Sequence, residues 1–204
     1  AQTFTSHTEA VIMPLGLDLK AYTFTDTSSG PLVWAGRISP EKGIEDSLRV
    51  AAHHDEKLVI AGSIDDDNYW AELTERFPEQ IDYRGHLNQH DLQCLLGEGR
   101  ALLQTQKWKE ALGLVTIEAL ACGTPVIAYQ RGANAELIRN GETGFLVMPD
   151  NVQEMSNAVT NIPKIDRNAC RAFAENHYSL ERFAMHLETW FDNALTQVKK
   201  EHRQ

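Results

Sequence analysis

The chain has 204 residues, which is enough for one large domain with its own hydrophobic core. Its net charge of −10, from 19 basic and 29 acidic residues, argues against nucleic acid or an anionic membrane as the main partner. No apolar run approaches the roughly 18 residues that a membrane span needs, and three scattered cysteines fit reduced thiols in a cytoplasmic protein. The chain begins without Met, so we expect it to be a piece of a longer protein.

Residues 1–30 are predicted to be an interdomain linker or lead-in rather than a domain of their own. They offer one short strand-like run, EAVIMPLGLD, which ends in a turn, followed by the polar segment DTSSGP. Neither segment has the length or the apolar content of an independently folding unit.

From residue 31 onward, short apolar runs alternate with helical patterns. Runs of about five residues that alternate with helices favour an α/β fold, in which a Rossmann-like parallel sheet carries helices on both faces. We therefore expect one Rossmann-like domain over 31–178 and a C-terminal helix over 179–204, the last of three helices that follow residue 150. Strands are predicted at 31–36, 57–62, 81–85, 101–105, 125–129 and 144–147, and helices between them at 41–54, 69–77, 89–99, 113–122 and 134–140.

The first turn from strand to helix, GRISPEKG, carries two basic residues. Ser39 suits an N-cap and Pro40 the first helical position, so Lys42 is expected in the first turn, where the helix dipole opposes a cation by roughly 0.3–1 kcal/mol. A residue placed against a local rule is a site candidate. Lys42 and Arg37 together could clamp a diphosphate, although two solvated surface cations would give the same pattern.

The segment from Gly113 to Cys122 predicts a helix that is buried nearly all round, because almost all of its residues are apolar or small. Glu118 interrupts this pattern, and a buried carboxylate is costly unless it is paired. A second acid, Glu110, lies in the turn before the helix. Two carboxylates beside the free N–H groups of a helix start suit a polyol that carries phosphates, whereas a structural glutamate tied to backbone N–H groups is the alternative for Glu118.

The 40-residue run WKEALGLVTIEALACGTPVIAYQRGANAELIRNGETGFLV, residues 108–147, resembles the donor site of retaining GT-B glycosyltransferases of family 4. The resemblance rests on the order Glu110, seven residues, Glu118, then ALACGTPVIA and NGETGFLV, and it extends over roughly residues 10–195. It implies one half of a GT-B fold. The implied reaction moves a glycosyl unit from a nucleoside diphosphate sugar, UDP-sugar being favoured over GDP-sugar, with retention of configuration and without a metal or other cofactor.

The same resemblance implies roles for individual residues. Arg37 and Lys42 would stabilise the departing diphosphate. Glu110 would contact hydroxyls of the donor sugar, and Glu118 would hold the ribose. Further candidates for contact with the nucleotide or the sugar are Gly36, Arg84, Gly85, His86, Gly113, Leu114 and Val115, of which residues 84–86 fit a plain turn equally well.

Several positions depart from the family's pattern or stay ambiguous. The family often has Glu-Pro-Phe-Gly where this chain has Glu-Ala-Leu-Gly, which leaves the sugar preference open. Gly132 could let the backbone approach the sugar, and Trp108 either lines the sugar pocket or packs under the loop. A Pro-x-Gly-x-Asp segment formed by Pro14, Gly16 and Asp18 resembles the link between the two GT-B domains and makes a hinge candidate.

The resemblance implies that these 204 residues are the C-terminal, donor-binding half of the enzyme. We expect the partners to be a nucleotide-sugar donor, an acceptor of unknown class, and an N-terminal acceptor domain of the same protein, but no nucleic acid. The chain alone is then expected to transfer little or no sugar, and peripheral membrane attachment would depend on the other half. A non-catalytic sugar-nucleotide-binding domain and a GT-B epimerase or phosphorylase are the alternatives.

Overall fold

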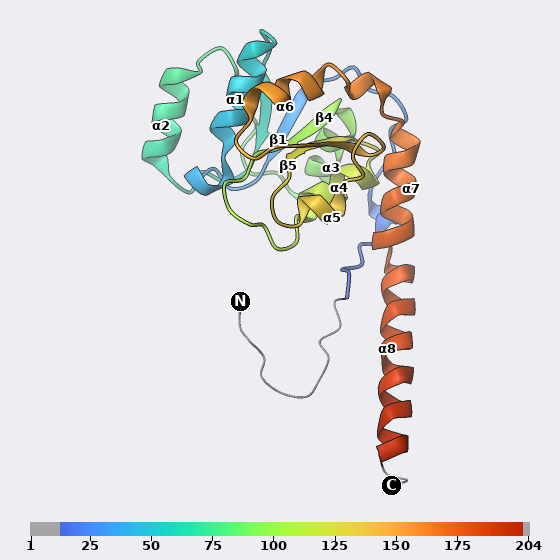
Figure 1. Cartoon of the computed structure of the whole chain (residues 1–204). Coiled ribbons are helices and arrows are strands. Elements are labelled where there is room, and N and C mark those ends of the chain that lie inside the picture. The colour runs from blue at the N-terminus through green and yellow to red at the C-terminus, as the bar shows by residue number, and fades with distance from the viewer. Residues whose placement is uncertain (1–12, 202–204) are drawn as a thin grey trace.

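A computed structural model describes residues 13–201 of the chain, with side chains described as far as residue 196. The elements alternate along the chain as the sequence predicts (Figure 1). The strands are β1 (Leu32–Ala35), β2 (Leu58–Ala61), β3 (Ile81–Tyr83), β4 (Ala101–Gln104), β5 (Val126–Tyr129) and β6 (Gly144–Val147). The helices are α1 (Ile44–His53), α2 (Asp67–Arg76), α3 (Gln89–Glu98), α4 (Leu114–Ala121), α5 (Asn134–Leu137), α6 (Val152–Val159), α7 (Arg167–Tyr178) and α8 (Leu180–Glu201), with 3₁₀ turns at Leu19–Ala21, Pro40–Lys42 and Ile162–Lys164.

All six strands form one parallel sheet in the order β3-β2-β1-β4-β5-β6. The order reverses between β1 and β4, and ligands of open parallel sheets bind outside the carboxyl ends of the strands at such a point. The predicted fold class, a Rossmann-like parallel sheet with helices on both faces, is therefore confirmed.

Alternating side chains of the strands face two separate hydrophobic cores, as the twofold period of a strand requires. On one face Leu32, Trp34 and Leu103 pack with α1, α2 and α6. On the other face Val33 and Leu102 pack with α3, α4 and α7. The helix α4 lies under the reversal point, and its first turn faces the carboxyl ends of β1 and β4. The fold thus brings the first turn from strand to helix next to the residues that follow β4.

The segment before β1 packs against the domain instead of forming the strand that its sequence suggests. Residues 9–12 of the strand-like run lie outside the described part, and the remainder forms only an isolated bridge between Leu17 and Ser179. Leu19 and Tyr22 are buried in the same core as α4 and α7. Residues 17–22 therefore contribute to the core of the domain, and the hinge role of the Pro14–Asp18 segment stays a prediction.

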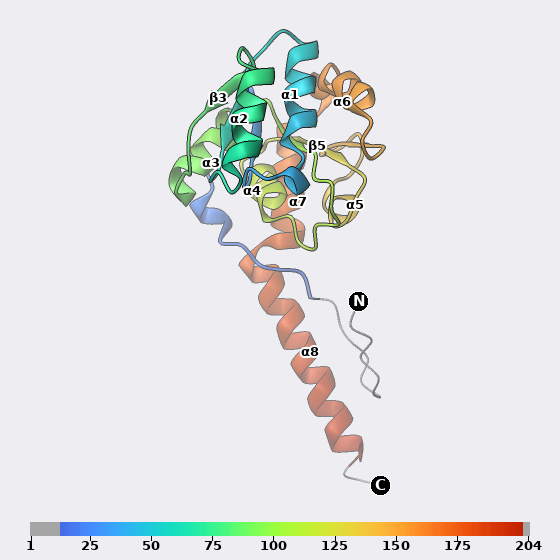
Figure 2. The ribbon, with the colours of Figure 1, turned by 90° about the vertical axis from the view of Figure 1, so that its left-hand side faces the viewer.

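The last helix, α8, projects away from the rest of the molecule, as both views show (Figures 1 and 2). It begins after Ser179, whose hydroxyl oxygen accepts from the backbone N–H of Arg182 at 3.3 Å. Its described part exposes several large apolar side chains, which are Leu180, Met185, Trp190, Phe191 and Leu195. No helix among residues 13–201 is both long enough and apolar enough to cross a membrane.

Candidate active site

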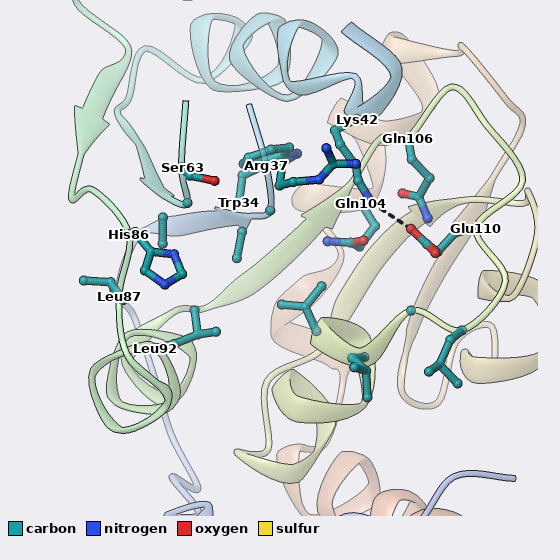
Figure 3. A pocket seen from close by; sticks show the side chains of 18 residues that line it. Trp34, Arg37, Lys42, Ser63, His86, Leu87, Leu92, Gln104, Gln106 and Glu110 are labelled. Atoms are coloured by element: carbon teal, nitrogen blue, oxygen red, sulfur yellow. Dashed lines mark hydrogen bonds and ion pairs between the residues drawn. The ribbon is translucent and has the colours of Figure 1, made fainter. Parts of the chain in front are cut away.

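A pocket of about 480 Å³ opens where the sheet order reverses, at the carboxyl ends of β1, β2 and β4 (Figure 3). Its volume lies in the range of small-molecule sites, and it combines an apolar wall with a few convergent polar groups. Its walls are formed by the turn after β1, the turns after β2 and β3, the loop between β4 and α4, and the first turn of α4. Predicted site residues that line it are Gly36, Arg37, Lys42, His86, Glu110, Gly113, Leu114 and Val115.

The turn after β1 differs in one respect from the expected geometry. Ser39 is the N-cap of a separate 3₁₀ turn over Pro40–Lys42, and its hydroxyl donates to the Glu41 carboxylate at 2.7 Å instead of capping the backbone. The helix α1 begins only after Gly43, so the prediction that Lys42 lies in its first turn is wrong. Gly43 has φ +68°, and a Cβ there would lie 2.0 Å from the carbonyl oxygen of Thr105. This left-handed glycine sets the break and lets the turn approach the end of β4.

Lys42 and Glu110 meet across the pocket, with Lys42 Nζ 2.8 Å from Glu110 Oε2. Both side chains are only about one-fifth exposed, at 21% and 20%. The ammonium of Lys42 also lies over the ring of Trp108, 5.0 Å from its centroid, although Trp108 itself is 44% exposed. Trp108 is therefore partly exposed beside Lys42 and is not among the residues that line the pocket, and its contact with a sugar stays a prediction.

Arg37 lies on the more exposed rim of the same pocket. Its guanidinium donates to Asp65 at 2.9 Å and lies 3.8 Å from Glu41, and its side chain is 54% exposed. Exposed pairs of this kind contribute roughly 0–1 kcal/mol, so a bound anion could replace these partners at little cost. The pocket can thus offer two cations, Arg37 and Lys42, to one ligand.

The loop between β4 and α4, residues 105–113, is held by a network of charged groups behind the pocket. The buried carboxylate of Asp46 accepts from the Tyr129 hydroxyl at 2.6 Å and from Lys107 Nζ. Lys107 also donates to Asp150 at 2.8 Å. Burial opposes the charge of Lys107, but its hydrogen bonds to Asp150 and Asp46 outweigh this effect and raise its pKa. The network fixes the base of the loop that carries Glu110.

The helix α4 is less completely buried than its sequence predicts. Leu114 is 43% exposed and lines the pocket together with Val115, whereas Ile117, Leu120 and Ala121 are fully buried. Gly113 caps the helix in the left-handed region at φ +68°. The first backbone N–H groups of a helix have no partner within it and favour an anion. The exposed start of α4 is therefore the part that can meet a ligand.

Glu118 does not line the pocket. Its Oε1 accepts from the Tyr22 hydroxyl at 2.9 Å, and that hydroxyl accepts in turn from Gln89 Nε2 at 3.0 Å. Burial raises the pKa of Glu118, while the hydrogen bond from Tyr22 acts in the opposite direction. The structure thus brings Glu110 and the start of α4 to one cavity but leaves Glu118 behind it, and its ribose-binding role stays a prediction.

Two more candidates from the turn after β3 lie outside the pocket lining. Arg84 is 56% exposed and donates to Asp82 at 2.8 Å, and Gly85 adopts φ +75° in an open turn. Only His86 of this group lines the cavity. A ligand in the pocket could reach His86, and contact of a ligand with Arg84 and Gly85 stays a prediction.

The structure explains why residue 132 is a glycine, and the reason differs from the one that the sequence suggested. A Cβ at this residue, which has φ +58°, would lie 2.4 Å from the Glu110 carbonyl oxygen. The Ala133 N–H donates to that same oxygen at 2.8 Å. Gly132 therefore lets its loop support the backbone of Glu110, and the space beside it is taken by protein instead of a sugar.

Sequence reasoning missed several polar residues of the pocket, above all Gln104 and Gln106. Both are nearly buried, at 8% and 3% exposure, and both line the cavity. A polar residue at the carboxyl end of a buried strand of a parallel sheet is the signal that could have identified Gln104. Ser63, after β2, was overlooked in the same way.

Comparison with protein families gives a match over residues 26–180 to the glycosyl transferases of group 1. Among curated proteins, the putative glycosyltransferase YtcC of Bacillus subtilis (strain 168) is 29% identical over 191 residues, which is 83% of this chain and 47% of that protein. The chain thus spans about half the length of this relative.

Solved structures share the fold at lower identity. AviGT4, a glycosyltransferase involved in avilamycin A biosynthesis, superposes with a TM-score of 0.79 at 22% identity, over 90% of this chain and 58% of that one. The Anabaena protein Alr3699/HepE, in a crystal structure with UDP and glucose, gives a TM-score of 0.75 at 22% identity, over 87% of this chain and 55% of that one.

Proposed function

The chain belongs to the glycosyl transferases of group 1, and on this basis we propose that it is the donor-binding half of a retaining glycosyltransferase of family 4. The observation that carries the proposal is the convergence of Arg37, Lys42 and Glu110 on the open start of α4 in one pocket. Cations and free N–H groups suit a diphosphate, and a carboxylate suits sugar hydroxyls.

In the proposed reaction the bond between the anomeric carbon and the donor phosphate breaks, and a bond to an acceptor hydroxyl forms on the same face of the sugar. The acceptor proton passes to the departing phosphate oxygen. Arg37 and Lys42 stabilise the charge that develops on that phosphate, which is the role a divalent cation would otherwise fill. Glu110 exchanges its ion pair with Lys42 for hydroxyls of the sugar, and no metal or cofactor is needed.

We propose a UDP-sugar as the donor, with a GDP-sugar as the second choice. The UDP-bound relative of the same fold supports the presence of a nucleotide-sugar site in this architecture but leaves the base open for this chain. His86 would lie closest to the base, and Glu118 would reach the ribose after a local adjustment of the Tyr22 hydroxyl.

The acceptor is proposed to bind to an N-terminal domain beyond these residues, since relatives of this chain are about twice its length. The chain alone should then bind the donor but transfer little or no sugar. Substantial turnover by the 204-residue chain would contradict this part.

We also propose a cytoplasmic location for the protein. Its three cysteines are free thiols, two of them buried, and reduced thiols are usual in that compartment.

The test is thermal unfolding of the chain in the presence of UDP, GDP, ADP and the corresponding sugar nucleotides. A ligand at about 100 times its Kd adds roughly 2.7 kcal/mol, or several degrees at about 2–4 °C per kcal/mol. We expect one base to give the largest shift, and the shift to fall sharply in Glu118→Ala and Lys42→Met. The absence of a shift with every nucleotide at millimolar concentration would refute the donor site.

A further inference from the structure

Gln106 carries a polar atom that the protein leaves without a partner at the wall of the pocket. Among the described residues, three buried side-chain atoms lack any hydrogen-bond partner, and they belong to Gln106, Thr116 and Asn134. Of these, only Gln106 lines the cavity, and its side chain is 97% buried, since 3% is exposed. An unpaired amide donor at such a site costs stability unless a ligand satisfies it.

The direction of the Gln106 side chain follows from its place after β4. Side chains alternate along an extended segment, and Thr105 turns toward α1, where its hydroxyl meets that of Ser47 at 2.9 Å. Gln104 and Gln106 therefore lie on the opposite side. In Figure 3 both amides point into the pocket, that of Gln106 toward the place where Lys42 and Glu110 meet.

The backbone of Gln106 is held from both sides, which keeps its amide oriented. The Arg131 guanidinium donates to the Gln106 carbonyl oxygen at 2.9 Å and to Asp150 at 2.7 Å. The next residue, Lys107, donates its N–H to the Glu41 carbonyl oxygen at 2.8 Å. The amide of Gln106 thus projects from a fixed position, and binding a ligand there needs little reordering of the loop.

We propose that Gln106 is a specificity-determining residue that donates a hydrogen bond to a hydroxyl of the transferred sugar. The inference rests on the proposed function and adds one residue to its site. Glu110 is an acceptor for hydroxyl protons, whereas the free N–H of Gln106 is a donor for a hydroxyl oxygen. The two side chains together can match one sugar hydroxyl pattern and reject a sugar that lacks the oxygen, because the amide would then stay unpaired.

Gln106→Met tests this inference, because Met keeps the length of the side chain and removes its hydrogen bonds. The matched control is Gln93→Met. Gln93 is equally buried at 3% exposure but is paired, since its Oε1 accepts from the Thr23 N–H at 2.9 Å, and it lies outside the pocket. Titration calorimetry would compare UDP, GDP and ADP with UDP-glucose, GDP-mannose and ADP-glucose for both variants and the unchanged chain.

We expect Gln106→Met to bind the sugar nucleotide about tenfold more weakly and the sugar-free nucleotide with unchanged affinity. Its free form should unfold at the same or a higher temperature than the unchanged chain, whereas Gln93→Met should unfold at a lower one and bind both ligands normally. Unchanged binding of the sugar nucleotide by Gln106→Met would overturn the inference but not the proposed function. An equal loss of affinity for the sugar nucleotide and the sugar-free nucleotide would do the same. If the unchanged chain binds none of the six ligands, the proposed function fails and the inference fails with it.

Discussion

Two polar regions lie at opposite ends of α4, and they differ in how completely their buried groups are paired. At the carboxyl end, the Arg167 guanidinium donates to Thr25, Gly99 and Gly97 carbonyl oxygens and to the Thr124 hydroxyl, all within 2.9 Å. At the amino end, the pocket leaves the Gln106 amide unpaired and pairs its cations with groups that a ligand can displace. The carboxyl end of α4 is therefore a structural joint between segments of the chain, whereas the amino end keeps polar groups that are free to pair with a ligand.

The joint also connects distant parts of the chain. Arg171 of α7 donates to carbonyl oxygens of Leu19, Tyr22 and Ala121 at 3.2, 3.0 and 2.7 Å. Its partners come from the segment before β1 and from the end of α4. The two arginines therefore attach α7 and the segment before β1 to the Rossmann-like core, and the pocket plays no part in this attachment.

The largest expected effect comes from breaking the joint with Arg167→Met. The substitution leaves several buried acceptors unpaired, so we expect a loss of about 3–5 kcal/mol in the free energy of unfolding. Urea denaturation measures it. Arg182→Met, which removes an exposed arginine of α8, should change stability by less than about 0.5 kcal/mol. A loss below about 1 kcal/mol for Arg167→Met would show that its hydrogen bonds are structurally dispensable.

A smaller effect is expected where the pocket is supported from behind, with Asp46→Asn. The amide keeps the shape but loses the charge that pairs with Lys107 and holds the Tyr129 hydroxyl. We expect a loss of about 2–3 kcal/mol in the free energy of unfolding and weaker donor binding, because the loop that carries Glu110 loses its anchor. The exposed Asp192→Asn on α8 serves as the control. Normal donor affinity in Asp46→Asn would show that this network is not needed to hold the donor site in place.

Features that depend on local sequence could be predicted, whereas contacts between residues far apart in the chain could not. The strands follow from local apolar runs such as LVWA and LVIA, so all six appear where they are expected. Glu110 and Lys42 are recognisable because they lie in turns that follow strands. The partner of Glu118 is Tyr22, 96 residues away, and neither this pairing nor the burial of Gln106 leaves a local pattern. The separate 3₁₀ turn around Lys42 was missed because it depends on the contact of Gly43 with Thr105.

Within the pocket, Lys42→Met should lower the free energy of unfolding by only about 1–2 kcal/mol, because Glu110 loses its ion-pair partner but about one-fifth of its side chain stays exposed to water. Its affinity for the nucleoside diphosphate should nevertheless fall by about 10- to 100-fold, since a cation beside the phosphates is lost. Calorimetric titration measures the affinity. Lys109→Met removes an exposed lysine of the same loop and should bind normally. Equal losses in both variants would indicate a general charge effect instead of a contact by Lys42.

The smallest effect concerns Glu118, which lies between the two regions. Because burial raises its pKa in the folded chain, the protonated form is favoured by folding. Its contribution to stability is therefore fully present below the unfolded-state pKa and is lost as the pH rises through the folded-state pKa. Glu118→Gln should match the unchanged chain near pH 4 and become slightly more stable than it toward pH 8, as thermal unfolding across this range would measure.

The ionisation of Glu118 should also affect the affinity for the nucleotide. Ribose hydroxyls that donate to the Glu118 carboxylate would favour its charged form, so nucleotide affinity should fall as the pH drops through the pKa of Glu118. Tyr22→Phe removes the hydroxyl that now donates to Glu118, which should move this fall in affinity to higher pH. Affinity that follows the same pH profile in Glu118→Gln would place Glu118 with the saturated joint at the other end of α4, as a structural residue.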